Sequence, residues 1–178
     1  EKDPLKLESL YNHMDLHRSK FFENEEVYEN LKTNLLPQLI KENQKDLKAL
    51  ILGCGTGEEA YSFLLVLHDF ILESGKDINL TLHASDIHQK TLKKNVMDQG
   101  NFPLEYKKEI PEKYHKYLTF DKESFQIIPE VRKQIIFSTS DILTPPKLFG
   151  MDIAVSQNTF TFLKKSFYKP LLEKMTVI

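Results

Sequence analysis

The chain has 178 residues and a formal net charge of -2, from 24 Lys and Arg against 26 Asp and Glu. This balance gives no electrostatic reason to expect a nucleic-acid partner, so small molecules or proteins are the expected partners. The single cysteine, Cys54, excludes an internal disulfide framework and a Cys-rich zinc site. The histidines show no ligand spacing, and no metal site is predicted. No apolar run reaches the ~18 residues of a membrane span, so a cytoplasmic protein without membrane insertion is expected.

The N-terminal part reads as a helical segment, residues 1–46, ahead of a domain over residues 47–178. Apolar residues at helical spacing predict a helix over 25–41, with Asn24 as its N-cap. Pro37 is expected to kink this helix or to end it early.

A buried strand over 47–52 stops at glycines, and a long helix is predicted over 58–74. Gly75 is placed to cap that helix at its C-terminus. The predicted inner face of the helix consists of Tyr61, Leu64, Leu65, His68 and Leu72.

The next elements alternate between strand and helix. A strand over 78–84 precedes a helix over 89–98, whereas residues 101–123 are expected mainly at the surface, apart from a short helix over 111–117. Further strands are predicted over 125–128, 134–137 and 151–155, and a further helix over 166–175. This alternation predicts an α/β fold with a mainly parallel sheet.

The turn after the first strand contains Gly53, Gly55 and Gly57. Strand, glycine-rich turn and helix together place backbone N–H groups beside a nucleotide-like ligand. The third glycine of the dinucleotide fingerprint falls on Glu58, so that pattern fails. Glu58 and Glu59 would also oppose a pyrophosphate. A phosphate-free cation suffers no such penalty, and S-adenosylmethionine fits that description.

Asp86 follows Gly57 by 29 residues and ends the second strand, where its carboxylate can accept hydrogen bonds from ribose hydroxyls. Two simpler interpretations stay open. Asp86 can instead cap the next helix, and Glu58 can simply complement the dipole of a first helical turn. Cys54 is interpreted as a small residue in a crowded turn.

Several short segments resemble, in order, motifs of the chemotaxis receptor methyltransferases, the CheR family. Residues 57–62 resemble its Gly-Glu-Glu-Pro-Tyr-Ser, 19–22 its Thr-x-Phe-Phe and 84–87 its Ala-Thr-Asp-Ile. The likeness continues through 125–137, Ser140 to Leu143 in place of its Asn-Leu, and Gln157-Asn158 in place of its Arg-Asn, so it runs from about Leu16 to the end.

The resemblance implies a Rossmann-like class I methyltransferase sheet. The implied reaction moves the methyl group of S-adenosylmethionine to glutamate carboxylates of a protein acceptor, a chemoreceptor, and leaves S-adenosylhomocysteine. It also implies that Glu58 holds the methionine amino group, Asp86 the ribose, and Asp141 and Ile142 the adenine, with Asn158 as the catalytic residue beside the reacting centre. The implied cofactor-binding set is Ser19, Gly53, Gly55, Gly57, Glu58, Asp86, Asp141, Ile142, Gln157 and Asn158.

Three polar functions of the family pattern are altered. Its arginine after Phe-Phe falls on Glu23, its later arginine on Gln157 and its tyrosine on Phe162. A Glu23 carboxylate facing the methionine carboxylate at ~4 Å would be repelled by ~4 kcal/mol at an effective dielectric of ~20. Arg18 or Lys20 are alternative cations. Two further functions therefore stay open: a catalytically impaired S-adenosylmethionine-binding module for sensing or assembly, and a small-molecule O-methyltransferase.

The family's N-terminal helical domain is represented only by its final segment. A class I sheet continues beyond a fourth parallel strand, and the chain stops at Ile178 where a fifth could begin. We therefore expect a sheet truncated at the C-terminus, completed by a missing segment or by an oligomeric partner, because an open sheet edge pairs readily.

Overall fold

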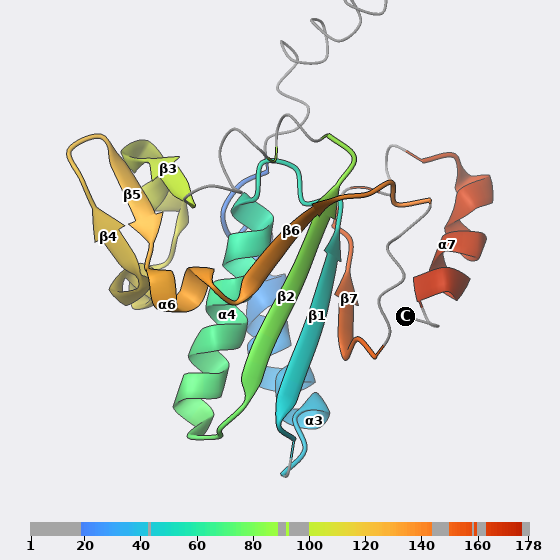
Figure 1. Cartoon of the computed structure of the whole chain (residues 1–178), viewed down its shortest axis with the longest axis horizontal. Coiled ribbons are helices and arrows are strands. Elements are labelled where there is room, and N and C mark those ends of the chain that lie inside the picture. The colour runs from blue at the N-terminus through green and yellow to red at the C-terminus, as the bar shows by residue number, and fades with distance from the viewer. Residues whose placement is uncertain are drawn as a thin grey trace, which may run out of the picture.

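The computed structural model describes residues 19–42, 44–88, 92, 100–143, 150–157, 159 and 163–175. Within these residues the larger sheet has four parallel strands in the order β6 (Ile135–Thr139), β2 (Asn79–Asp86), β1 (Asp46–Leu52) and β7 (Ile153–Val155). The helix α4 (Glu58–Ser74) packs against this sheet, a smaller sheet lies to one side, and α7 (Tyr168–Met175) lies beyond β7 (Figure 1). The predicted α/β architecture with a mainly parallel sheet is confirmed.

The register places β1 in the middle of the sheet. Leu50 lies opposite His83 of β2 and Ala154 of β7, and every residue from Ala49 to Leu52 is buried. Such a run without alternation is typical of a central parallel strand. Because all four strands are parallel, their carboxyl ends meet at one edge of the sheet.

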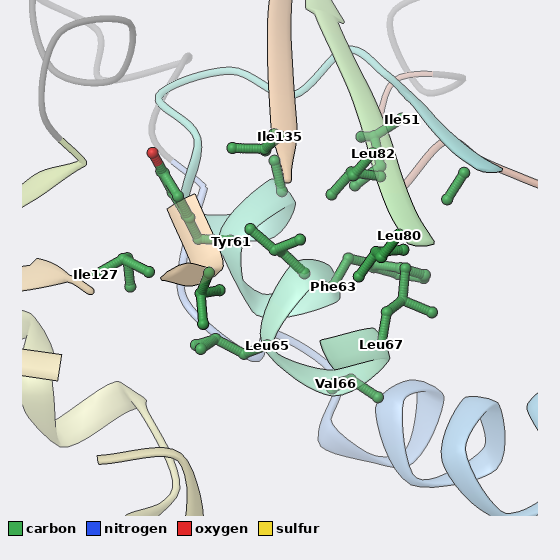
Figure 2. Packing of buried hydrophobic residues seen from close by; sticks show 14 of the residues in the cluster. Ile51, Tyr61, Phe63, Leu65, Val66, Leu67, Leu80, Leu82, Ile127 and Ile135 are labelled. Carbon is green, nitrogen blue, oxygen red and sulfur yellow. The ribbon is translucent and has the colours of Figure 1, made fainter. Parts of the chain in front are cut away.

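The helix α4 has the predicted bounds, and Gly75 caps it with a φ of 65° and an N–H that donates to the carbonyl of Leu72 at 3.2 Å. The predicted inner face was partly wrong, because Leu72 is 60% exposed. From Glu58 to Leu67 every residue of the helix is buried. Figure 2 shows the reason: strand residues such as Ile135 lie on one side of α4, the N-terminal helices on another, and Ile127 of the smaller sheet on a third.

The N-terminal helix is shorter than predicted. It runs through α2 (Glu25–Asn30), a π-helical turn η1 (Leu31–Leu35) and α3 (Leu36–Leu39), with Pro37 in the first turn of α3. Asn24 occupies the predicted N-cap position of α2, but without the usual side-chain cap. Asn24 has a φ of 62° and makes no capping bond with its side chain, and only its carbonyl accepts from the N–H of Val27, at 2.9 Å.

Residues 101–123 lie mainly at the surface, as predicted, but they contain more regular structure than the sequence pattern indicated. The segment forms β3 (Asn101–Pro103), the 3-10 turns η2 (Leu104–Glu109) and η3 (Glu112–Tyr117), and β4 (Leu118–Phe120). The predicted strand β5 (Ser124–Ile127) is present, but it pairs antiparallel with β3 and β4 in a separate sheet. The short helix predicted over 111–117 is present as the 3-10 turn η3, in which a spacing of three buries Tyr114 and Tyr117.

The strands β6 and β7 and the helix α7 overlap the predicted ranges, whereas the helix before β6 was not predicted. A short helix α6 (Pro129–Arg132) precedes β6, and the 3-10 turn η5 (Lys165–Phe167) leads into α7. The predicted helix over 89–98 lies outside the described residues, Leu92 excepted. Among the helices that the structure describes, none combines the length and apolarity that crossing a membrane requires.

Asp69 of α4 joins three parts of the fold. Its Oδ2 accepts from Lys32 Nζ of η1 at 2.7 Å, and its Oδ1 accepts from Lys116 Nζ and the Tyr117 hydroxyl of η3, each at 2.7 Å. Burial alone would raise the pKa of Asp69, but the hydrogen bonds from Lys116, Lys32 and Tyr117 hold it well below its usual range. This carboxylate therefore ties the N-terminal helices and the smaller sheet to α4.

Replacing Asp69 by Asn should lower the free energy of unfolding at neutral pH by about 1–3 kcal/mol, because two lysines lose their charged acceptor. A carboxyl whose pKa is depressed on folding contributes stability above its unfolded pKa of 3.8, and that stability is lost as the pH falls below this value. Urea unfolding should therefore show the gap between wild type and Asp69→Asn narrowing below about pH 4.

The matched control is Glu73→Gln, since Glu73 contacts the same Lys32 Nζ at 2.8 Å from an exposed position. Its effect should stay below about 1 kcal/mol. Equal stability of Asp69→Asn and wild type at neutral pH would show that the Asp69 carboxylate does not stabilise the packing of the N-terminal helices and the smaller sheet on α4.

Candidate functional site

The carboxyl ends of β1, β2 and β6 are tied together by backbone hydrogen bonds. After β1, the N–H groups of Gly53 and Cys54 donate to the carbonyl of Ser85 at 2.8 and 3.0 Å. After β6, the N–H of Ser140 donates to the carbonyl of Asp86 at 3.0 Å. This edge lies at the upper end of the larger sheet (Figure 1) and is where ligands of open α/β sheets bind.

The three glycines of the turn all have left-handed backbones, with φ values of 78° for Gly53, 53° for Gly55 and 98° for Gly57. At Gly53 the immediate neighbour is protein. A Cβ there would lie 2.2 Å from Oγ1 of Thr159, whose hydroxyl donates to the carbonyl of Leu52 at 3.3 Å. Packing of the segment after β7 therefore explains Gly53.

Glu58 is 2% exposed, and its carboxylate accepts hydrogen bonds from two sides. Its Oε2 accepts from the Ser19 hydroxyl at 2.9 Å and from the hydroxyl of Thr56 in the glycine turn. The Ser19 Oγ in turn accepts from the N–H of Glu59 at 3.4 Å. Ser19 and Glu58, which the resemblance grouped, thus lie in contact.

Asp86 bridges two turns with its two carboxylate oxygens. Oδ2 accepts from the N–H of Gly55 at 2.8 Å, and Oδ1 accepts from the N–H of His88 at 2.9 Å. The second bond is local, while the first fixes the glycine turn, and the helix that Asp86 was expected to cap lies outside the described residues. An ionised carboxylate has about four acceptor positions, so these bonds leave capacity for ribose hydroxyls.

The other residues of the implied set lie at the same edge where the structure describes them. The turn containing Asp141 and Ile142 follows Ser140, and Asp141 Oδ1 accepts from the N–H of Leu143 at 2.9 Å. After β7, Gln157 Nε2 donates to the carbonyl of Glu23 at 3.3 Å. Asn158, Phe162 and Arg18 lie outside the described residues.

Glu59 is a candidate site residue to which the sequence analysis gave no role beyond disfavouring a pyrophosphate. It is 6% exposed, and its Oε1 has no hydrogen-bond partner within the described part of the chain. Burial, and then the charge of Glu23, raise the pKa of Glu59 to about 8. The sequence feature that could have drawn attention to Glu59 is Glu23, an acid at a position where the family pattern has an arginine.

The segment before α2 brings the charge of Glu23 close enough to raise the pKa of Glu59. Phe22 and Asn24, on either side of it, have φ values of 51° and 62°, and the N–H of Phe22 donates to Ser62 Oγ at 2.9 Å. Tyr28 is 2% exposed and its hydroxyl has no hydrogen bond of good geometry among the described residues. Burial, and then the charges of Glu59 and Glu23, raise the pKa of Tyr28.

Replacing Glu59 by Gln should remove a pH dependence of stability. A carboxyl whose pKa is raised on folding contributes most below its unfolded pKa, and this contribution is lost as the pH rises through the folded value of about 8. Between about pH 5 and about pH 9, wild type should lose on the order of a few kcal/mol relative to Glu59→Gln in denaturant unfolding. Exposed Glu26 provides the control Glu26→Gln, and parallel pH profiles of Glu59→Gln and wild type would disprove the assignment.

Comparison with known proteins agrees with this geometry. Residues 17–178 match the family described as CheR methyltransferase, SAM binding domain. The chain is 27% identical to the "Chemotaxis protein methyltransferase" of Listeria innocua and 26% identical to that of Listeria monocytogenes, in each case over 163 residues, 91% of this chain and 60% of the relative. It is 23% identical over 176 residues to the "Uncharacterized 104.1 kDa protein in hypE 3'region" of Rhodobacter capsulatus, covering 97% of this chain and 18% of that protein.

The chain thus spans about three fifths of the length of the curated Listeria relatives. The family match covers nearly the whole chain, and the sheet order and strand-end acids described above accompany it. The chain therefore belongs to the CheR methyltransferase SAM-binding domain family, and S-adenosylmethionine is the cofactor of this domain.

Proposed function

We propose that the chain is the cofactor-binding domain of a methyltransferase that esterifies glutamate carboxylates of a protein acceptor, a chemoreceptor. The observation that carries the proposal is the pair of acids, Glu58 and Asp86, which hold consecutive residues of one glycine turn, Thr56 and Gly55. The names of the Listeria relatives support the chemotaxis acceptor.

The residues at this edge fit a phosphate-free, positively charged adenosyl ligand. Glu58 would accept from the methionine ammonium, since Ser19 and Thr56 already fix its orientation. Asp86 would accept from the ribose hydroxyls, and the turn with Asp141 and Ile142 would flank the adenine. Each of these roles uses oxygen acceptors or apolar surface, with no requirement for a phosphate-binding cation.

The main contribution of the protein to this reaction is to position the cofactor and the acceptor carboxylate. S-adenosylmethionine supplies a methyl group on a sulfonium, and a carboxylate oxygen attacks it in line, which needs no covalent enzyme intermediate. Holding the two reactants in line supplies much of the acceleration of such a displacement. Asn158 remains the proposed residue beside the reacting centre, next in the chain to Gln157 at the carboxyl end of β7.

Glu23 and Glu59 favour a second candidate function. This function is a cofactor-binding module for sensing or assembly that does not transfer a methyl group. The charge of Glu23 lies close enough to raise the pKa of Glu59, and the resemblance places an arginine at that position. Both candidates require cofactor binding, and only the first requires methyl transfer.

Incubating the full-length protein with labelled S-adenosylmethionine and chemoreceptor cytoplasmic fragments should produce base-labile methyl esters. Glu58→Gln should reduce transfer at subsaturating cofactor about tenfold or more, because a charge-assisted hydrogen bond contributes about 1.5–3 kcal/mol. Calorimetric titration with S-adenosylhomocysteine measures cofactor binding separately. Binding without transfer to any fragment would reject the methyltransferase and favour the binding module, whereas no binding would reject both.

Replacing Asp86 by Asn should weaken S-adenosylhomocysteine binding about 10- to 100-fold, since the amide retains only one acceptor oxygen for Gly55, His88 and ribose. Calorimetry at constant pH gives the dissociation constant. The control Asp77→Asn removes a carboxylate that is 97% exposed, just before β2 at the opposite end of that strand, and should change the affinity less than about twofold. Equal affinities for Asp86→Asn and wild type would refute the role of Asp86.

A further inference from the structure

The segment before α2, residues 19–23, contacts both the cofactor edge and the smaller sheet. At one end, the Ser19 hydroxyl donates to Glu58 Oε2 in the first turn of α4, at 2.9 Å. Two residues later, the N–H of Phe21 donates to Glu109 Oε2 at 3.2 Å, in the 3-10 turn η2 that follows β3. The roles assigned so far use Ser19 and Glu58, and they leave Phe21 and Glu109 unused.

The side chain of Phe21 is buried in the smaller sheet. Its ring lies edge-on to Phe102 of β3 at 4.8 Å and is tilted against Phe125 of β5 at 5.8 Å. Aromatic pairs at such distances attract one another beyond the effect of the area they bury. The smaller sheet therefore holds position 21 by its side chain, and Glu109 holds it by its backbone.

Ser19 contacts the cofactor edge through three hydrogen bonds. Its N–H donates to Thr56 Oγ1 at 3.3 Å, its hydroxyl donates to Glu58 Oε2, and its Oγ accepts from the N–H of Glu59 at 3.4 Å. The Thr56 hydroxyl donates to the same oxygen of Glu58. The position of Ser19 thus helps to set the position of the carboxylate that is proposed to bind the methionine ammonium.

The two anchors are close together in the chain. One residue, Lys20, separates Ser19 from Phe21, and two residues of extended chain span at most about 7 Å. On the other side, the N–H of Phe22 donates to Ser62 Oγ at 2.9 Å, and Phe22 has a φ of 51°. A residue other than glycine keeps such a backbone only where surrounding contacts impose it. A shift at Phe21 is therefore transmitted to Ser19.

We propose that Glu109 and Phe21 are positioning residues for the cofactor. They hold Ser19 where its hydroxyl orients Glu58 toward the methionine ammonium. This role rests on the part of the proposed function that concerns Glu58, and it requires neither the protein acceptor nor methyl transfer. It gives the smaller sheet, which lies to one side of the larger one (Figure 1), a part in cofactor affinity.

Calorimetric titration of the full-length protein with S-adenosylhomocysteine tests this role. Glu109→Ala should weaken binding about three- to tenfold, because the Phe21 N–H loses its acceptor and Ser19 its fixed position. Glu109→Gln keeps an acceptor oxygen and should bind within about twofold of wild type. The control Glu105→Ala removes an exposed carboxylate from the same turn η2 and should also stay within about twofold.

A double variant separates positioning through Ser19 from a general structural effect. Ser19→Ala alone should weaken binding about tenfold, since Glu58 loses a hydroxyl donor. Adding Glu109→Ala should weaken it less than about twofold further, because the bond through which Glu109 acts is already gone. Losses that multiply, to about 30-fold or more, would mean that Glu109 acts by another route, and the proposal would be rejected.

Equal affinities of Glu109→Ala and wild type would also overturn the proposal. Equal losses in Glu109→Gln and Glu109→Ala would do the same, since they would assign the effect to the charge of Glu109 and not to its bond with Phe21. If Glu58→Gln weakens S-adenosylhomocysteine binding and Glu109→Ala does not, the positioning role fails alone. If Glu58→Gln leaves binding unchanged, the proposed role of Glu58 fails and the positioning role fails with it.

Discussion

The hydrogen bond from the N–H of Gly55 to Asp86 Oδ2, 2.8 Å long, is the contact on which the rest of the site depends. It fixes the turn after β1 to the end of β2, although the two residues are 31 positions apart in the chain. Thr56, the next residue, bonds to Glu58 on the helix side. The turn is therefore shaped by two acids of the protein before any ligand arrives. Such preorganisation reduces the ordering cost of binding and makes the glycine turn a fixed frame for the adenosyl ligand.

The two adjacent acids of α4 differ because of their neighbours. Both lie in the first turn, where the helix dipole favours negative charge by about 0.3–1 kcal/mol. Glu58 also receives hydroxyl hydrogen bonds, whereas Glu59 faces burial and the charge of Glu23. The pKa of Glu59 rises to about 8, so desolvation and repulsion together outweigh the dipole there. A buried carboxyl with a raised pKa lowers the stability of the protein at neutral and higher pH. Such a cost is typical of residues that serve binding.

The sequence predicted those parts of the molecule whose determinants are local. The apolar run from Leu47 to Leu52, the glycines after it and Gly75 define β1 and both ends of α4, because strand burial and left-handed turns leave direct signatures. Asp86 was placed correctly at a strand end. The smaller sheet was missed because its strands are short and its aromatic contacts, such as Phe21 against Phe102 at 4.8 Å, join distant segments. The burial of Glu59 Oε1 without a partner among the described residues was also not predictable, since only the fold shows how the two adjacent acids differ in their neighbours.

The acid at position 23 alters one half of the site and leaves the other in place. The glycine turn is held by Asp86, Glu58 and Ser19, and none of these bonds involves the Glu23 side chain. Phe22, which precedes Glu23, is held by the hydrogen bond from its N–H to Ser62 Oγ. This bond fixes the backbone next to position 23 independently of the side chain there. Reversal of the charge therefore leaves the frame for the adenosyl ligand intact and changes the electrostatic potential toward β7, where Gln157 contacts the carbonyl of Glu23. A change of side chain at position 23 therefore leaves the bonds that hold the glycine turn in place.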